Sequence, residues 1–444
     1  MGRRAAARLR QPLCVAVVGR LSAGKSTLLN SLLGTSVSPT AGGECTRLVY
    51  VFRHGWWTSA VAAPRDGSAP RPVTFQGSTL PSVMPLPHAD IKSVDVTLRV
   101  PFLEEATLID TPGMASTDVE NSALTDRLLA DTSDAAVRAD ALVFCVNGPL
   151  KDDEADAIRL FRAGRGGSRL SGGTAVGVLT KADRLTADRR TTWKEAVELA
   201  RTMSTRHADI FGGVVPVIGL LAETATTGGL RERHAWALAA LAREWHPDTS
   251  NTALVHEEIF YETPGSVDVG QRRELVALLG LYGIGELLDA VRGGTQAHAA
   301  ALTAAARAVS GFDEMSSRLS VALGARADVL KAAVALQELT ERAQESGDLD
   351  IYDAAQSLLD RPEMFSLRVL EVARQLASGQ VRPPSGLADQ AWVLVTMGLS
   401  AVSTREAARN VAAWRDWAAL TDGAGRSVAR VMVRAWQLAA SNGG

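Results

Sequence analysis

The sequence predicts an α/β domain with a mainly parallel sheet, followed by an all-α half. In the first half, near-continuous apolar runs of strand length, such as 13–18 and 139–146, alternate with segments of helical spacing. The second half is rich in alanine, and its apolar residues recur at helical intervals. Ligands of such sheets bind outside the carboxyl ends of the strands. We therefore looked for the site where each apolar run ends.

The first apolar run ends in a glycine-rich loop that leads into an apolar helical stripe. The loop reads Gly19-Arg20-Leu21-Ser22-Ala23-Gly24-Lys25-Ser26-Thr27. Its glycines let the backbone curl, so that N–H groups and the positive end of the next helix point at a β-phosphate. Lys25 would span the β and γ oxygens, and Ser26 would bind Mg²⁺. We expect Gly19, Ala23, Gly24, Lys25, Ser26 and Thr27 to bind nucleotide.

A polar loop over 38–46 precedes a second predicted strand over 47–53. In a GTPase, a threonine of this loop must reach back to the metal. Thr40 and Thr46 are both candidates, and we prefer Thr46 because it lies just before the strand. The segment 54–92 is rich in Pro, Gly and Ser, and we expect an inserted hairpin with long loops there.

The runs 94–100 and 106–109 are predicted to form an antiparallel pair whose second strand ends at the nucleotide. That strand leads directly into Asp110-Thr111-Pro112-Gly113. Asp110 would hold Mg²⁺ through water. Gly113 would donate its N–H to the γ-phosphate, because a glycine lets the backbone approach closely and then move away.

A later apolar run, 174–179, ends in Thr180-Lys181-Ala182-Asp183. The Asp183 carboxylate can accept two parallel hydrogen bonds from the N1–H and amine of guanine, whereas adenine offers no such pair of donors. The stem of Lys181 can lie across the base. A further strand over 214–218 leads into a loop, 219–222, that would close over the base. The residues therefore predict GTP specificity, with Thr180, Lys181 and Asp183 at the base.

Composition limits the partners. Lys and Arg number 47 against 49 Asp and Glu, so the chain lacks the basic field of a nucleic-acid binder, and we expect no DNA partner. The three cysteines are far apart, which fits a reducing cytoplasm without disulfides. Arginines precede the first apolar run, but that run is the strand before the phosphate loop and has no cleavage site, so we expect an unexported protein.

These motifs resemble those of bacterial dynamin-like GTPases, and more narrowly of the isoniazid-inducible dynamin-like proteins of mycobacteria. The resemblance rests on the 19–27 loop, Glu44-Cys45-Thr46-Arg47, the wide gap to Asp110, Thr180–Asp183 and Val217–Ala222. Further support comes from Phe52-Arg53-His54-Gly55 and from Leu278–Ile284. It covers most of the first 290 residues and is fainter beyond them.

The resemblance implies a P-loop GTPase domain, placed at 1–272, and a helical neck and trunk bundle at 273–444. It implies GTP and GDP as ligands, Mg²⁺, a monovalent cation (K⁺ or Na⁺), and pairing of GTPase domains with a second copy or a related dynamin-like protein. Lys25, Ser22, Thr46 and Gly113 would be catalytic: Ser22 positions water and the monovalent cation, Thr46 holds Mg²⁺ and water, and Gly113 contacts the γ-phosphate. Metal ligands would be Ser26, Thr46 and Asp110. Relatives usually carry leading helices that complete the neck, and we expect that here either the neck is shortened or a partner supplies the helix.

Two positions depart from related GTPases. Leu21 stands where many dynamins have glutamine, and Met114 stands where small regulatory GTPases keep a water-orienting glutamine. Neither side chain can orient water by hydrogen bonding. We therefore expect slow intrinsic hydrolysis, and a GTP-binding scaffold without hydrolysis stays an alternative.

The helical half offers one stretch suited to membrane contact, 391–401, which contains Trp392. It is too short to span a bilayer, which needs about twenty residues. An interfacial patch and a buried bundle helix both fit this stretch. Trp414 and Trp417, and the stripe Val428, Met432, Ala435 and Ala439, are expected in a bundle core.

Two functions remain open. The first is a dynamin-like GTPase that couples GTP hydrolysis to domain pairing and membrane remodelling, peripheral at the inner face of an anionic cell membrane. The second is a cytoplasmic switch GTPase that docks a protein or RNA partner through its helical half. Compact basic RNA-binding domains accompany GTPases of the second kind, whereas this tail is long and neutral.

Overall fold

The structure is a computed structural model. It describes residues 12–20, 22–38, 48–81, 83–112, 139, 141–150, 155, 175–186, 188–207, 210, 211, 213–320, 332, 335, 336, 339, 340, 343–359, 365–377, 381–384, 386–397 and 403–442.

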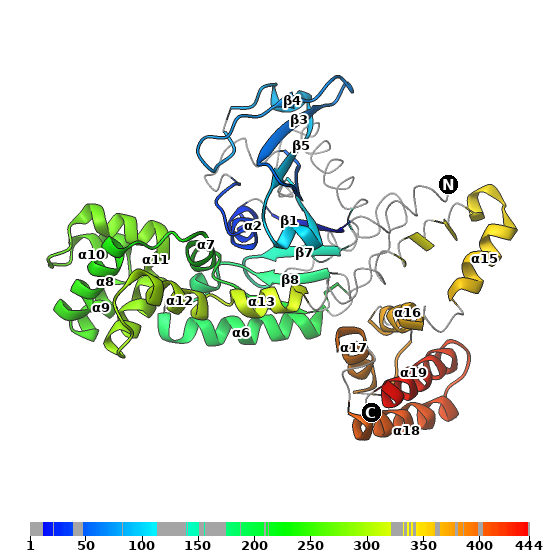
Figure 1. The fold of residues 1–444 in the computed structure, drawn as a ribbon. Helices are drawn as coiled ribbons and strands as arrows, with labels where there is room; N and C mark the ends of the chain where they lie inside the picture. The colour runs from blue at the N-terminus through cyan, green and yellow to red at the C-terminus, as the bar shows by residue number, and fades with distance from the viewer. Residues whose placement is uncertain are drawn as a thin grey trace.

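The described residues of the first half form one nine-stranded sheet, ordered β4-β3-β5-β2-β6-β1-β7-β8-β9 (Figure 1). The strands are β1 (Leu13–Gly19), β2 (Tyr50–His54), β3 (Ser59–Pro64), β4 (Arg71–Pro72), β5 (Ile91–Leu98), β6 (Ala106–Asp110), β7 (Ala141–Val146), β8 (Ala175–Leu179) and β9 (Val214–Pro216). Strands β6, β1, β7, β8 and β9 are parallel, and β2 is antiparallel to β6. The predicted mainly parallel sheet is confirmed.

The expected antiparallel pair of 94–100 and 106–109 is wrong, because β2 lies between these strands. Tyr50 of β2 is opposite Val94 of β5 on one side and Asp110 of β6 on the other. The short helix α3 (Phe102–Glu105) joins β5 to β6, where a paired hairpin would need a tight turn. Since Tyr50, Val51 and Phe52 are all buried, β2 is an interior strand with a neighbour on each side.

The inserted segment contains a small antiparallel pair, as expected. Val61 and Ala62 of β3 are opposite Pro72 and Arg71 of β4, and β3 also pairs with β5 in the antiparallel sense. The 3₁₀ turn η2 (His88–Asp90) then leads into β5.

The residues of β1 point alternately into two hydrophobic clusters, as expected for a strand buried on both sides. Val15 and Val17 join a cluster with α2 and α13, whereas Ala16 and Val18 join one with α6, α8, α11 and α12. The helices of this half are α2 (Lys25–Leu33), α6 (Arg189–Arg206), α7 (Gly219–Thr227), α8 (Glu232–Glu244), α9 (Pro247–Ala253), α10 (Glu257–Glu262), α11 (Val269–Arg292), α12 (Ala299–Val309) and α13 (Phe312–Leu319).

The shared core extends beyond residue 272. Leu275 and Leu287 of α11, Leu302 of α12 and Phe312 of α13 are buried in the same two clusters as the sheet. The predicted division after residue 272 falls inside α11. We propose that the sheet domain continues to Leu319 and that the helical half begins after it.

The last helices share a separate core. They are α16 (Phe365–Ala377), α17 (Leu387–Met397), α18 (Thr404–Leu420) and α19 (Gly423–Asn442), and α15 (Leu349–Leu359) precedes them in the chain. Figure 1 shows α16 to α19 gathered in one group. Trp414 and Trp417 are buried in its core with their rings edge to face, centroids 5.6 Å apart. The expected stripe Val428, Met432, Ala435 and Ala439 is buried there as well.

The stretch considered for membrane contact lies partly in α17. Ala391 and Leu394 are buried in the bundle core, which favours the bundle interpretation for the part that is described. Residues 398–401 lie outside the described residues. Within the described part of the chain, no helix is both long enough and apolar enough to cross a membrane.

Candidate functional site

The phosphate-loop residues lie between the end of β1 and the start of α2. Only glycine fits at position 19, because a Cβ there would lie 2.5 Å from the carbonyl oxygen of Cys145 on β7. Gly24 has φ 81° and Ser22 has φ 59°, so the backbone turns through left-handed conformations at both positions. The N–H of Ala23 donates to the Arg20 carbonyl at 3.1 Å, which closes the turn.

Lys25 is the first residue of α2, and its ammonium is turned back over the loop. Nζ donates to the carbonyl oxygens of Gly19 at 3.1 Å and Arg20 at 3.0 Å. Its relative exposure is 7%. A buried cation bonded only to neutral carbonyls in the described residues is free to exchange them for charged phosphate oxygens, which bind it more strongly.

Asp110 ends β6 beside β1, opposite Val17. Burial raises the pKa of its carboxyl group to about 6, although the charge of Lys25 and a hydrogen bond from Ser38 oppose this. Ser38 Oγ donates to Oδ2 at 3.5 Å, whereas the buried Oδ1 has no hydrogen-bond partner among the described residues. A buried carboxylate oxygen without a partner fits the water shell of Mg²⁺, which prefers oxygen ligands. The Asp110 carboxylate is therefore suited to hold Mg²⁺.

Thr111 fixes the start of the next segment. Its Oγ1 donates to the Val17 carbonyl at 2.9 Å and its N–H donates to the same oxygen at 3.3 Å. Thr111 is therefore held against β1, two residues before that strand ends at Gly19.

Thr180 joins the end of β8 to the phosphate loop and to β7. Its Oγ1 lies 2.7 Å from the Ala23 carbonyl oxygen and 3.0 Å from the Val146 carbonyl oxygen, and its N–H donates to Val146 at 2.7 Å. Thr180 also packs on Gly24, since a Cβ built on Gly24 would lie 3.4 Å from Thr180 Cβ. The third motif is thereby held directly against the first.

Asp183 follows in the short 3₁₀ turn η4 (Ala182–Arg184), after Lys181 in a left-handed conformation with φ 52°. Its side chain is 16% exposed, and burial raises the pKa of its carboxyl group. Arg184 Nε lies 3.8 Å from Oδ2, a distance that is too long for a good hydrogen bond. The carboxylate therefore retains capacity for the two donors of guanine.

The structure thus brings together, at one edge of the sheet, the described residues predicted from the sequence. These are Gly19, Ser22, Ala23, Gly24, Lys25, Ser26, Thr27, Asp110, Thr180, Lys181 and Asp183. The expected loop over 219–222 is wrong, because these residues form the first turn of α7. The start of α7 lies close to α2, since a Cβ on Gly219 would lie 3.2 Å from Thr27 Cγ2. Leu21, Thr40, Thr46, Gly113 and Met114 lie outside the described residues, so their roles stay predictions.

One site residue was missed by sequence reasoning. Asn30 of α2 accepts from the N–H groups of Val37 at 3.1 Å and Ser38 at 2.8 Å, and it donates to Glu223 Oε1 of α7 at 2.8 Å. Asn30 thereby positions Ser38, which contacts Asp110. An asparagine in a predicted helix gives no such signal, because its acidic partner lies 193 positions away.

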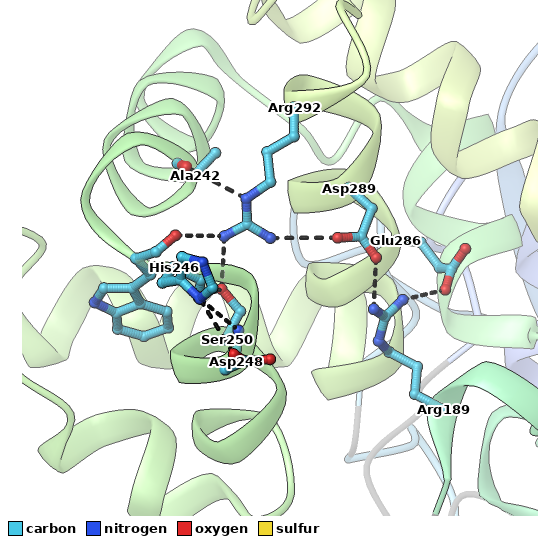
Figure 2. Close-up of polar contacts among 9 residues, drawn as sticks. Arg189, Ala242, His246, Asp248, Ser250, Glu286, Asp289 and Arg292 are labelled. Carbon is cyan, nitrogen blue, oxygen red and sulfur yellow. Dashed lines mark hydrogen bonds and ion pairs between the residues drawn. The ribbon is translucent and has the colours of Figure 1, made fainter.

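A chain of ion pairs links the start of α6 to α11 (Figure 2). Arg189, the first residue of α6, binds Glu286, and its Nη2 lies 2.5 Å from Asp289 Oδ2. Asp289 is also 3.3 Å from Arg292, whose guanidinium donates to the Trp245 carbonyl at 2.9 Å. The helix that begins just after Asp183 is thereby fastened to α11.

The chain is similar in sequence to known proteins. Residues 15–79 match the model of the Dynamin family. Over 288 residues the chain is 35% identical to isoniazid-induced protein IniC of Mycobacterium tuberculosis, in strains CDC 1551 and H37Rv alike. That alignment covers 63% of this chain and 57% of the relative, so the chain spans little more than half the length of the curated relatives it matches.

Solved structures of an oligomerised bacterial dynamin pair, described as a mechanism for long-range sensing and tethering of membranes, are also similar. They align over 99% of this chain and 70% of theirs, with 15% identity and TM-scores of 0.37 and 0.36. Scores this low do not allow residue positions to be transferred. The dynamin-model match at 15–79, which includes the phosphate loop, and the 35% identity to IniC instead show that the chain is similar to the bacterial dynamin-like family.

Proposed function

We propose that this chain binds GTP with Mg²⁺ and hydrolyses it slowly. The observation that carries the proposal is the convergence of three motifs at one sheet edge, with Thr180 bonded to the phosphate loop and Asp110 Oδ1 left without a partner among the described residues. Similarity to the Dynamin family supports GTP hydrolysis as the reaction.

Each part of the nucleotide would meet a different group. Backbone N–H groups of the loop and the start of α2 would bind the β-phosphate, and Lys25 would leave the Gly19 and Arg20 carbonyls for the β and γ oxygens. Asp183 would accept from the guanine edge. Ser26 and Asp110 would hold Mg²⁺, with Thr46 as a third ligand. When bound, Mg²⁺ neutralises charge on the β and γ oxygens.

The proposed rate is slow because Leu21 and Met114 cannot orient water. Thr46 and the Gly113 N–H would then position the water and the γ-phosphate, and Ser22 would help to hold a monovalent cation. Ser22 is exposed on the loop, where its side chain is accessible to an ion.

We further propose that the GTP cycle is coupled to pairing of GTPase domains and to membrane binding at the inner face of the cell membrane, with the protein otherwise cytoplasmic. Similarity to the Dynamin family and to IniC supports this coupling. The partner would be a second copy or a related dynamin-like protein, and the membrane would be anionic.

A soluble switch that docks a protein through its helices is the second candidate. One observation favours it: Ala391 and Leu394, in the stretch best suited to lipid, are buried in the bundle core. In that case GTP binding is retained and lipid is not required.

One experiment separates the two candidates. GTP turnover by the purified chain is measured with and without anionic liposomes, alongside co-sedimentation in the GTP, GDP and nucleotide-free states, with Lys25→Ala as the inactive control. Lipid-stimulated turnover and nucleotide-dependent co-sedimentation would support the membrane proposal. Turnover that is indifferent to lipid, without co-sedimentation, would support the soluble switch. If the wild type and Lys25→Ala show the same background turnover, the GTPase proposal fails.

A further inference from the structure

Helix α11 is broken at Gly280, where φ is 63° and ψ is 171°. Glycine adopts this combination readily, whereas residues with a side chain are strained there. Thr224 of α7 holds the chain at the break, since its Oγ1 donates to the Leu278 carbonyl at 2.5 Å. The break is therefore a defined feature that a neighbouring helix stabilises.

The break faces the residue assigned to the base. A Cβ built on Gly280 would lie 4.0 Å from Oδ2 of Asp183 and 3.7 Å from Cδ2 of Leu220. Burial raises the pKa of nearby Tyr282 to about 12, and the negative charges of Glu286 and Asp183 contribute to this. Asp183, the first turn of α7 and the break in α11 therefore lie close together.

The part of α11 after the break is held tightly in place. A Cβ on Gly283 would lie 2.3 Å from Leu221 Cδ2, and one on Gly285 would lie 2.5 Å from Arg189 Nε, so both glycines allow close approach. Arg189 then binds Glu286 and Asp289, as Figure 2 shows. The wall that α11 presents to Asp183 is thus fixed from α6 and α7.

We propose that the Gly280 break of α11 forms one wall of the guanine subsite and that Gly280 determines base specificity by leaving that wall without a side chain. This inference rests on the proposed GTP binding. Donor nitrogens of guanine would lie about 2.9 Å from the Asp183 oxygens. A methyl group 4.0 Å from Oδ2 would compete for the same space, because non-bonded carbons need about 3.5 Å from a base atom.

The direct test is Gly280→Ala, compared with Gly294→Ala. Gly294 also has a positive φ, 99°, but no described atom lies within 4 Å of the Cβ that it would gain. Gly294→Ala therefore measures the effect of backbone strain without steric crowding. Affinities for GTP and for ribose 5′-triphosphate, which has no base, are measured by calorimetry. We expect Gly280→Ala to lose tenfold or more in GTP affinity, about the effect of one charged hydrogen bond, and to keep its ribose 5′-triphosphate affinity.

Thr224→Val supplies a second variant, because Gly280→Ala can also fail to fold. It removes the hydroxyl that holds the break and keeps the shape of the side chain. Thr227→Val is its control, since among the described residues the Thr227 hydroxyl bonds within its own helix, to the Glu223 carbonyl at 2.7 Å. We expect Thr224→Val, but not Thr227→Val, to lower GTP affinity about threefold with unchanged ribose 5′-triphosphate affinity, a partial loss of one hydrogen bond's effect.

The outcomes separate this inference from the proposed function. If the wild type binds no guanine nucleotide, the proposed function fails and this inference fails with it. If the wild type binds GTP, and folded Gly280→Ala and Thr224→Val both bind it as their controls do, the inference alone is overturned. Equal losses for GTP and ribose 5′-triphosphate would also overturn it, because they would locate the effect at the phosphates.

Discussion

The Thr180 hydroxyl lies 2.7 Å from the carbonyl oxygen of Ala23, across 157 positions of sequence. This bond joins the segment that we propose reads the base to the phosphate loop, so the Thr180 side chain connects the two proposed subsites. The same hydroxyl reaches Val146 at the end of β7. The ends of β7 and β8 and the phosphate loop thus meet at one oxygen atom.

Replacing Thr180 by valine should therefore weaken GTP binding about tenfold, the effect of about 1.4 kcal/mol. The variant keeps the shape of the side chain but leaves the Ala23 and Val146 carbonyls without this donor, which also costs about 1–3 kcal/mol of folding stability. Thr180→Ser retains the hydroxyl and should stay within about threefold of wild type. GTP titration and urea unfolding check both effects. A valine variant with wild-type affinity would show that the bond has no part in binding.

Asp110→Asn tests the magnesium assignment. The wild type should bind GTP more tightly with Mg²⁺ than with EDTA, whereas the variant should lose most of that difference, because an amide is a weaker ligand than a carboxylate for the ion's water shell. Asp95→Asn is the control, since Asp95 lies on β5 and pairs with exposed Arg53. A Mg²⁺ effect that persists undiminished in Asp110→Asn would contradict the assignment.

The site motifs could be predicted because each lies within a few consecutive residues. Lys25, Asp110 and Asp183 each follow an apolar run at its carboxyl end, and parallel strands bring those ends to one edge. Local residue type and strand direction were therefore sufficient to predict where these site residues lie. The burial of Trp414 and Trp417 followed in the same way from helical spacing.

What the sequence did not reveal depends on distant partners. Strand β2 lies between β5 and β6, although alternation in those strands suggested that they pair. Likewise, the stripe in α11 predicted a helix but not that the helix packs on the sheet domain. Periodicity reports how much of an element is buried, not which neighbour buries it.

Asn30→Asp tests the link between α2 and the segment that contacts Asp110. The variant retains an acceptor for the N–H groups of Val37 and Ser38 but places a carboxylate against Glu223. Burial already raises the pKa of Glu223, so a second negative charge should destabilise the fold by about 2–4 kcal/mol in urea unfolding at neutral pH. Adding Glu223→Gln should restore most of the loss. If the double variant is no more stable than Asn30→Asp, repulsion between the introduced carboxylate and Glu223 is not the cause of the lost stability.

Thr46→Ala and Thr40→Ala distinguish the two threonines that precede β2. Loss of the threonine that holds Mg²⁺ and water should leave GTP affinity within about threefold of the wild-type value. It should lower the hydrolysis rate by a hundredfold or more, because the attacking water loses its orientation. We expect this from Thr46→Ala. Single-turnover hydrolysis with saturating GTP measures it. The same loss in Thr40→Ala alone would assign the role to Thr40.

Asp183→Asn should exchange guanine preference for xanthine preference. The amide can donate to the additional carbonyl of xanthine but cannot accept both guanine donors, so GTP affinity should fall a hundredfold or more while xanthosine triphosphate affinity rises, a change of about 3 kcal/mol for hydrogen bonds to a charged group. Because burial raises the pKa of the Asp183 carboxyl group, ionisation disfavours the folded nucleotide-free state, and the uncharged variant should melt no lower than wild type at neutral pH. Competition binding with the two triphosphates and thermal unfolding provide the measurements. A variant that melts normally and still selects GTP would mean that another residue reads the base.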